Sequence, residues 1–188
     1  FWNAVDDSTN FQRNLSLGEV EVCDSVIYHK TEYRERRNHF AYYAVNTPFD
    51  SFETDQKTFL GAYGSIEHPK AVQEGKLHNT MGSGGSVIGA HHFSITLKPG
   101  ESRSLIFLLG YSENPVDEKW EKPGIINKQR AQAAIARLSS DAQIDAALAA
   151  LKADWENILS SYILESNDEK LNRMVNIWNQ YQCMVTFN

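Results

Sequence analysis

The first part of the chain carries short stretches in which apolar and polar residues alternate, separated by residues that favour turns. Alternation of this kind is typical of β-strands that bury one face. The predicted strands are 15–22, 26–28, 39–45, 58–63, 88–97 and 103–111. The last strand is apolar throughout, which favours a central position in its sheet. Short connections without intervening helices predict an antiparallel β-sandwich.

After residue 111 the apolar residues recur every three or four positions, which is the period of a helix. Asn127 is a candidate N-cap for an alanine-rich helix that ends near residue 138. Ser140 and Gln143 match a capping box, and a second helix with one apolar seam follows. The seam consists of Ile144, Leu148, Leu151, Trp155 and Ile158.

A third helix is predicted at 166–188, where Ser166 and Glu169 match another capping box. Apolar residues lie on several of its sides, so it needs neighbours to cover it. The sequence stops at Asn188 without a C-cap glycine and begins at Phe1 without a methionine or signal peptide. We therefore expect an interior piece of a longer protein with β structure first and helices after it. The expected parts are a β-sandwich domain at 1–111, a linker with two helices at 112–165 and the start of a helical domain at 166–188.

Composition narrows the classes of function. A hydrophobic content of 41% suits a globular domain, and no apolar run approaches the roughly 18 residues of a membrane span. The net charge of −6 argues against binding to nucleic acid. Cys23 and Cys183 lie in unlike surroundings and make no disulfide framework, which favours the cytoplasm.

Neither a phosphate-binding loop nor a metal site is expected. Gly82, Gly84, Gly85 and Gly89 lack the Gly-Lys-Ser/Thr ending and lead into a strand, so a flexible loop is favoured. His91 and His92 are adjacent on a predicted strand, so their rings point to opposite faces and cannot share a metal. No cofactor is predicted.

The cluster Arg34, Arg36 and Arg37 is interleaved with Glu32 and Glu35. A solvated hairpin tip with ion pairs is therefore favoured over a contact with nucleic acid.

The opening segment 1–14 combines spaced aromatic residues with amides, carboxylates and one arginine. Sugar recognition uses flat apolar faces for stacking and planar polar groups for neighbouring hydroxyls. Polar loops are common, so residue chemistry alone leaves an ordinary surface loop as the favoured interpretation.

Long stretches of the chain resemble glycoside hydrolase family 94, the inverting cellobiose phosphorylases. These stretches are 2–22, 28–46, 97–111 and 168–188. The resemblance implies a β-sandwich, a helical linker, an (α/α)6 barrel and a small C-terminal sheet. The present chain would then hold part of a larger antiparallel β-sandwich, the linker and the first barrel helix.

The resemblance also implies reversible phosphorolysis of cellobiose to α-glucose 1-phosphate and glucose with inversion. An aspartic acid would protonate the glycosidic oxygen, while inorganic phosphate, the co-substrate, attacks the anomeric carbon. In this family the acid and the phosphate pocket lie on the barrel, beyond Asn188. No catalytic residue is therefore expected in this chain.

Members of the family are homodimers in which the sandwich of one subunit reaches the barrel site of the other. The matching loop implies that Asn3, Asn10, Gln12 and Arg13 bind the sugar, and hydrogen bonds at the dimer interface are the alternative. Other substrates would be cellodextrin, cellobionic acid or chitobiose. A noncatalytic carbohydrate-binding sandwich and a structural dimerisation module are alternatives from other classes.

Overall fold

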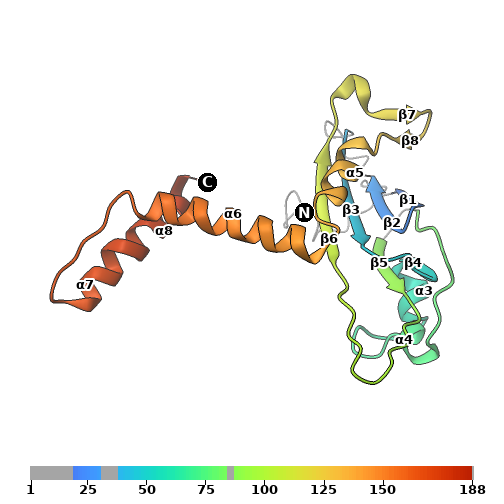
Figure 1. The fold of residues 1–188 in the computed structure, drawn as a ribbon. Coiled ribbons are helices and arrows are strands. Elements are labelled where there is room, and N and C mark those ends of the chain that lie inside the picture. Colours follow the sequence, from blue (N-terminus) through green and yellow to red (C-terminus); the bar gives the residue numbers. More distant parts are fainter. Residues whose placement is uncertain (1–18, 31–37, 84–86, 188) are drawn as a thin grey trace. The chain divides into compact units, whose positions relative to one another are not determined.

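The computed structural model describes residues 19–30, 38–83 and 87–187 (Figure 1). The chain divides into two units, Phe1–Ser140 and Asp141–Asn188, each of which is considered by itself. The described part of the first unit contains strands and short helices, and that of the second contains helices.

A four-stranded antiparallel sheet in the order β1-β2-β3-β6 forms the centre of the first unit. Two-residue turn geometry joins β1 to β2, because Asp24 and Ser25 both have positive φ, at 50° and 61°. The Oγ of Ser25 accepts a hydrogen bond from the amide of Phe49 at 3.3 Å, which fixes the turn. The strands are β1 (Glu19–Cys23), β2 (Val26–Lys30), β3 (His39–Val45) and β6 (Phe107–Glu113).

The predicted strands at 26–28 and 39–45 are confirmed, and the described part of the first strand begins at Glu19. Within the described residues β6 lies at the edge of the sheet. The prediction that this strand is central was therefore wrong for the described sheet. An apolar strand can also lie at an edge when something else covers its faces.

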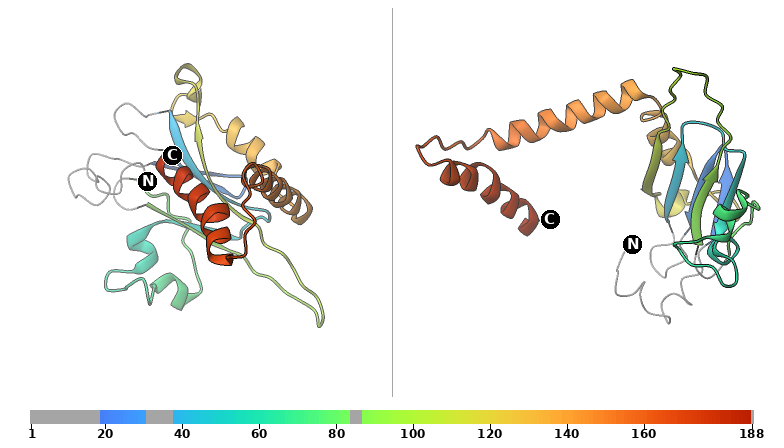
Figure 2. Two further views of the ribbon diagram at one scale, coloured as in Figure 1. Left: turned by 90° about the vertical axis from the view of Figure 1, so that its left-hand side faces the viewer. Right: turned by 90° about the horizontal axis from the view of Figure 1, so that it is seen from below.

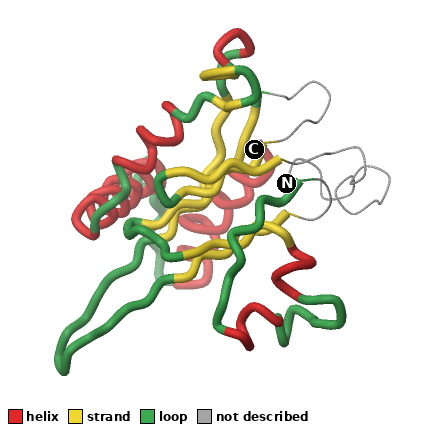
Figure 3. Tube along the Cα trace, turned by 90° about the vertical axis from the view of Figure 1, so that its right-hand side faces the viewer, coloured by secondary structure: helices red, strands yellow, loops and turns green. Residues whose placement is uncertain are grey.

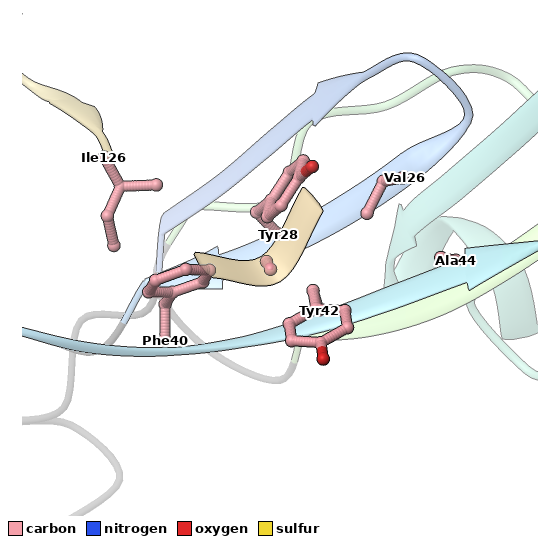
Figure 4. Close-up of a cluster of buried hydrophobic side chains, with 7 residues drawn as sticks. Val26, Tyr28, Phe40, Tyr42, Ala44 and Ile126 are labelled. Carbon is pink, nitrogen blue, oxygen red and sulfur yellow. The ribbon is translucent and has the colours of Figure 1, made fainter. Parts of the chain in front are cut away.

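One face of the sheet carries the main core (Figure 4). Tyr28 and Phe40 are fully buried with ring centroids 6.1 Å apart, and Ile126 packs in the same cluster. Gly110 pairs with Tyr42 across the strands, and a Cβ at Gly110 would lie 2.0 Å from Cζ of that ring. A glycine is required there because the tyrosine ring crosses over the neighbouring strand.

A second antiparallel pair, β4 (Ser51–Asp55) and β5 (Val87–His92), packs on the opposite face. The ring of His91 stacks on Tyr43 with centroids 4.4 Å apart and planes at 12°. Tyr42 and Tyr43 are adjacent in β3, so their side chains point to opposite faces of the sheet. Antiparallel sheets on one another, with helices after them, confirm the predicted fold class.

The strand predicted at 58–63 was wrong, because α3 (Gln56–Leu60) occupies its first half. Asp55 caps this helix and accepts hydrogen bonds from the amide of Thr58 at 2.7 Å and from its hydroxyl at 2.8 Å. Gly61 ends the helix with φ of 84°. A short apolar run fits both a strand and a helix, and here the cap decided.

The charged stretch after β6 also holds structure that the sequence did not suggest. The amide of Gln129 donates to Oδ1 of Asn127 at 3.1 Å, so Asn127 caps near the predicted place although Lys128 is the first residue outside the helix. The remaining elements of the first unit are α4 (Lys70–Glu74), η1 (Val116–Glu118), β7 (Trp120–Lys122), β8 (Ile125–Ile126) and α5 (Gln129–Ala136).

In the second unit the chain leaves α6, reverses direction through a connection at 160–168 and continues as a last helical stretch (Figure 2). Asp168 caps that stretch, with Oδ1 accepting from the amides of Lys170 at 2.9 Å and Leu171 at 3.3 Å. The predicted cap at Ser166 was wrong, since its hydroxyl bonds to Asn172 instead. The elements are α6 (Asp141–Leu159), α7 (Glu169–Arg173), the π-helical turn η2 (Met174–Trp178) and α8 (Asn179–Phe187).

Candidate functional site

The residues predicted to bind sugar lie outside the described residues. These are Asn3, Asn10, Gln12 and Arg13. The predicted basic tip with Arg34, Arg36 and Arg37 lies outside them as well. The structure does describe the points at which these segments join the fold.

Those points meet at one corner of the first unit. Glu19, which begins β1, is the cross-strand partner of Lys30, which ends β2. Nζ of Lys30 lies 3.0 Å from Oε2 of Glu19. Ser83 forms an isolated β-bridge with Glu19. Glu19, Lys30 and Ser83, which each border one of the segments 1–18, 31–37 and 84–86, are therefore neighbours in space.

A network of largely buried charges lies beside this corner. Glu21 on β1 accepts a hydrogen bond from the amide of Ile126 at 3.0 Å and pairs with Lys128. The same carboxylate lies 3.0 Å from Nζ of Lys30. Lys30 also donates to the carbonyl oxygen of Gly124 at 2.9 Å. The network ties β1 and β2 to the hairpin of β7 and β8.

The surroundings of these groups keep them charged. Burial alone would raise the pKa of Glu21, but the bonds from Lys128, Ile126 and Lys30 outweigh it and hold the pKa below its ordinary value. Burial alone would lower the pKa of Lys30, and the carboxylates of Glu19 and Glu21 hold it above its ordinary value. A general acid must carry a proton before it can donate one. The carboxylate of Glu21 stays ionised, so it serves to hold the structure together and not as a proton donor.

A second buried carboxylate, Glu53 on β4, holds the loop before Ser83. Its Oε1 accepts from the amides of Thr54 at 3.0 Å and Asp55 at 3.1 Å, and its Oε2 accepts from the amide of His78 at 3.3 Å. Nδ1 of His78 lies 3.9 Å from the same Oε2. Sequence reasoning missed Glu53, because a glutamate in a polar stretch gives no sign that it will be fully buried.

Gly82 is held against the same strand. Its amide donates to Oγ1 of Thr54 at 2.7 Å, and that hydroxyl donates to the carbonyl oxygen of Thr80 at 2.6 Å. A Cβ at Gly82 would lie 2.7 Å from the carbonyl oxygen of Thr54. Gly82 is thus required by a close approach of two backbones, whereas the flexible loop predicted for Gly84 and Gly85 falls outside the described residues.

A hollow of about 460 Å³ lies among β5, α3 and α4. His91 in its wall stacks on Tyr43 and also on Phe49, at a centroid distance of 4.8 Å. Neither ring nitrogen of His91 has a hydrogen-bond partner among the described residues, and burial lowers its pKa to about 4. The ring is neutral near pH 7 and serves as an aromatic surface. Other residues in the wall are Phe59, Val72, Leu77, Phe93 and Phe107.

The described residues contain no group of three or more His, Cys, Asp or Glu side chains that could hold a metal ion. In the same part of the chain, no helix is both long and apolar enough to span a lipid bilayer.

The second unit has a different arrangement, in which side-chain amides of the last helical stretch bind the connection before it. Asn172 accepts from the amide of Ser166 at 2.8 Å and donates to the carbonyl oxygen of the same residue at 2.9 Å. Asn176 makes the same two bonds with Leu164, at 2.8 and 2.9 Å. Each asparagine thus offers one donor and one acceptor, as a neighbouring β-strand would.

Gln180 continues this pattern by donating from Nε2 to the carbonyl oxygens of Tyr162 at 3.2 Å and Leu159 at 3.1 Å. We call Asn172, Asn176 and Gln180 the amide ladder. Four helical residues rise about 6 Å and two residues of extended chain about 6.6 Å, so the two partners stay in register. Residues four apart drift by about 40° around an α-helix, and the wider π-helical turn at η2 offsets this drift.

Apolar side chains of the second unit lie open in the described residues. On α6 the predicted seam is confirmed in place, and Leu148 and Ile158 are 58% and 54% exposed. On the last helical stretch Met174 and Trp178 are 59% and 54% exposed. That neighbours cover these exposed faces stays a prediction.

Two descriptions of known protein families match the sequence. The glycosyl hydrolase 94 supersandwich domain matches residues 1–141. The catalytic domain of the glycosyl hydrolase 94 superfamily matches residues 154–188.

Several curated proteins are similar along most of the chain. An N,N'-diacetylchitobiose phosphorylase from Vibrio proteolyticus is 27% identical over 189 residues, covering 98% of this chain and 22% of that protein. A 3-O-beta-D-glucopyranosyl-beta-D-glucuronide phosphorylase from Paenibacillus borealis is 24% identical, covering 95% of this chain and 20% of that protein. A cyclic beta-(1,2)-glucan synthase from Rhizobium meliloti is 28% identical over 145 residues, covering 77% of this chain and 5% of that protein. The chain thus spans about a fifth of the length of the two phosphorylases.

Proposed function

Because the chain belongs to glycosyl hydrolase family 94, we propose that it is part of an enzyme that cleaves a disaccharide with inorganic phosphate. Residues 1–141 belong to the supersandwich domain and residues 154–188 to the start of the catalytic domain. The observation that carries the proposal is that two proteins named as disaccharide phosphorylases align with at least 95% of the chain.

In the proposed enzyme the described residues act as scaffold. The carboxylate oxygens of Glu21 and Glu53 accept hydrogen bonds from backbone amides, and the ring of His91 stays neutral. As the family resemblance implies, the general acid is proposed to be an aspartic acid beyond Asn188, which protonates the glycosidic oxygen. Phosphate attacks the anomeric carbon from the opposite face and needs no activating base, because it is already an anion. This geometry gives inversion.

The proposed reaction is tested with the complete protein and separate disaccharides. Sugar 1-phosphate should be released only when inorganic phosphate is present. Cellobiose is the substrate that the family resemblance implies, and N,N'-diacetylchitobiose and glucosyl-glucuronide are compared with it because similar proteins carry those names. Hydrolysis that proceeds equally well without phosphate would reject phosphorolysis, and release from another disaccharide alone would reject cellobiose.

Asn3, Asn10, Gln12 and Arg13 are proposed to contact the sugar in the site of a partner subunit, which makes a homodimer part of the proposal. Support comes from the chemistry of amides and guanidinium groups and from the resemblance of the loop that holds them. In the complete protein Arg13→Ala should raise KM for the disaccharide at least about tenfold, which corresponds to loss of one charged hydrogen bond. An unchanged KM would remove Arg13 from the site. We place the enzyme in the cytoplasm.

A second candidate function is glucan synthesis, favoured by the similarity of 145 residues to the cyclic beta-(1,2)-glucan synthase. It predicts that the complete protein alters long glucans and that added phosphate does not stimulate it. A noncatalytic carbohydrate-binding module is disfavoured by the match of 154–188 to a catalytic domain.

A further inference from the structure

The loop 76–83, between α4 and β5, is fastened along the edge of β4 that faces away from β5. Figure 3 shows it as a loop that runs from α4 towards the sheets. The amide of Asn79 donates to the carbonyl oxygen of Phe52 at 2.8 Å, and Oδ1 of Asn79 accepts from the amide of Phe52 at 2.8 Å. Asn79 has a φ of 57°, so the loop bends sharply at this residue.

Two buried polar side chains of β4 hold the same loop. Glu53 and Thr54 are both 0% exposed. Glu53 accepts from the amide of His78, and the hydroxyl of Thr54 bonds to both Thr80 and Gly82. A buried carboxylate or hydroxyl costs free energy unless it is hydrogen-bonded, so both side chains favour the position of the loop in which they are satisfied.

The far end of the loop meets the four-stranded sheet. Ser83 forms its β-bridge with Glu19, the first described residue of β1. The carboxylate of Glu19 also lies 3.0 Å from Nζ of Lys30. Within the described residues β1 is an edge strand of the four-stranded sheet, and β4 belongs to the separate pair. The loop therefore connects the edges of two sheets, and the place of Glu19 depends on the place of the loop.

Glu19 matters because the chain reaches it directly from the residues proposed to contact sugar. Arg13 lies six positions before Glu19 along the chain. A fully extended chain spans at most about 3.5 Å per residue, so Arg13 lies within about 20 Å of Glu19. A shift of Glu19 thus moves the region that the guanidinium group of Arg13 can reach. Hydrogen bonds depend steeply on distance and angle, so a small shift is enough to weaken a sugar contact.

We propose that Glu53 and Thr54 are positioning residues for sugar binding, which act through the loop 76–83 and Glu19 on the segment that contains Arg13. This role rests on the proposed function, in which Arg13 contacts a sugar. Glu53 and Thr54 do not touch the sugar themselves. They fix the point from which the segment leaves the sheet, so release of the loop from β4 should weaken sugar binding and leave the chemical step nearly unchanged.

Substitutions at Thr54 test this role in the complete protein, with the disaccharide that the phosphorolysis assay identifies. Thr54→Val keeps the shape of the side chain and removes the hydroxyl that holds Thr80 and Gly82. KM should rise at least about fivefold, as expected for one weakened hydrogen bond, and kcat should change less than about twofold. Thr54→Ser keeps the hydroxyl and should keep the natural KM. An unchanged KM in Thr54→Val overturns the proposal.

Three further variants separate positioning from stability. Gly82→Ala places a Cβ 2.7 Å from the carbonyl oxygen of Thr54 and pushes the same loop away from β4, so it should also raise KM. This variant carries the test if Thr54→Val does not fold. Glu53→Gln should raise KM too, because its NH2 group cannot accept from an amide.

Asp55→Ala is the matched control on the same strand. It removes the cap of α3 and leaves the bonds of the loop 76–83 in place, so it should lower Tm without raising KM. If Asp55→Ala raises KM as much as Thr54→Val does, lost stability is the cause and the proposal is wrong.

Combination with Arg13→Ala separates this role from the proposed function. If Thr54 acts through the segment, Thr54→Val should raise KM less than about twofold when residue 13 is already alanine, because coupled residues do not act additively. Equal fold-changes in both backgrounds overturn the proposal. If Arg13→Ala raises KM and Thr54→Val does not, the positioning role fails while the sugar contact stands. If Arg13→Ala leaves KM unchanged, the sugar contact fails and the positioning role fails with it.

Discussion

Two segments without regular secondary structure differ in whether their backbone groups have hydrogen-bond partners in the described chain. The connection at 160–168 and residues 93–106 between β5 and β6, which we call the arm, both lie outside any β-ladder of the described chain. In the connection, Asn172 and Asn176 each bind the amide and the carbonyl of one residue. Along most of the arm no described residue does so. The backbone of the connection thus finds its hydrogen-bond partners within this chain, whereas most of the backbone of the arm finds none among the described residues.

The two units also differ in the charge of the groups that hold their segments together. The amide ladder consists of uncharged groups, so its contribution to stability does not depend on pH. The first unit is tied at its corner by the carboxylate of Glu21 and the ammonium groups of Lys30 and Lys128. Acid should therefore loosen the first unit before it affects the connection in the second.

The largest effect is expected at the centre of the ladder. In the complete protein Asn176→Leu leaves the amide and the carbonyl of Leu164 without a partner, which should lower the free energy of unfolding by about 2–4 kcal/mol. Asn176→Asp keeps the acceptor and should cost less. Urea unfolding of both variants provides the measurement. If Asn176→Leu is as stable as the natural protein, the connection is held by something other than the ladder.

An intermediate effect is expected at Glu21, and it should vary with pH. Glu21→Gln removes the ion pairs but can keep the bond from Ile126, so we expect a loss of about 1–2 kcal/mol at pH 7. The folded pKa of Glu21 lies below its ordinary value of 4.5, so its stabilising contribution is complete above pH 4.5 and is lost as the pH falls through the folded pKa. The natural protein and Glu21→Gln should therefore converge in stability in acid. A constant difference from pH 7 to pH 3 would show that charge is not the cause.

The fold could be predicted where apolar and polar residues alternate regularly. The prediction failed where polar residues are buried. The strands at 26–28 and 39–45 follow directly from their pattern. β4 was missed because Ser51–Asp55 contains one large apolar residue, and its fully buried members are Glu53 and Thr54. Their partners come from the loop at 76–83, which no local pattern reveals.

The amide ladder could not be predicted for a related reason. Asparagine inside a helix is usually unfavourable because its side chain competes for backbone groups. Here that tendency is useful, since Asn172 and Asn176 bind the backbone of another segment. Ser166 and Asp168 are both good capping residues, so their sequence could not decide which one caps. The sugar-binding prediction for Asn3, Asn10, Gln12 and Arg13 came from a resemblance and stays a prediction.

A further pH effect is expected at His91, next to the base of the arm. Its pKa is about 4 in the folded protein and 6.5 ordinarily, so the fold prefers the neutral ring. Stability is then complete above pH 6.5 and falls as the pH drops from 6.5 to 4. His91→Phe keeps an aromatic surface against Tyr43 and Phe49 and should reduce this slope, as measured by urea midpoints at pH 7 and pH 5. An identical slope in the variant would mean that other groups cause the acid sensitivity.

The smallest effect is expected on the arm, and it sharpens the comparison most. Leu97 is half exposed in the described chain, so Leu97→Ser would change little if the arm ended in solvent. If other residues of the complete protein cover it, the same change should cost about 1 kcal/mol, because an apolar side chain is then withdrawn from water. Ile66→Ser is the matched control, since Ile66 is 76% exposed in a loop and should be neutral in either case. Equal urea midpoints for the two variants would mean that the arm stays as open in the complete protein as it is in this chain.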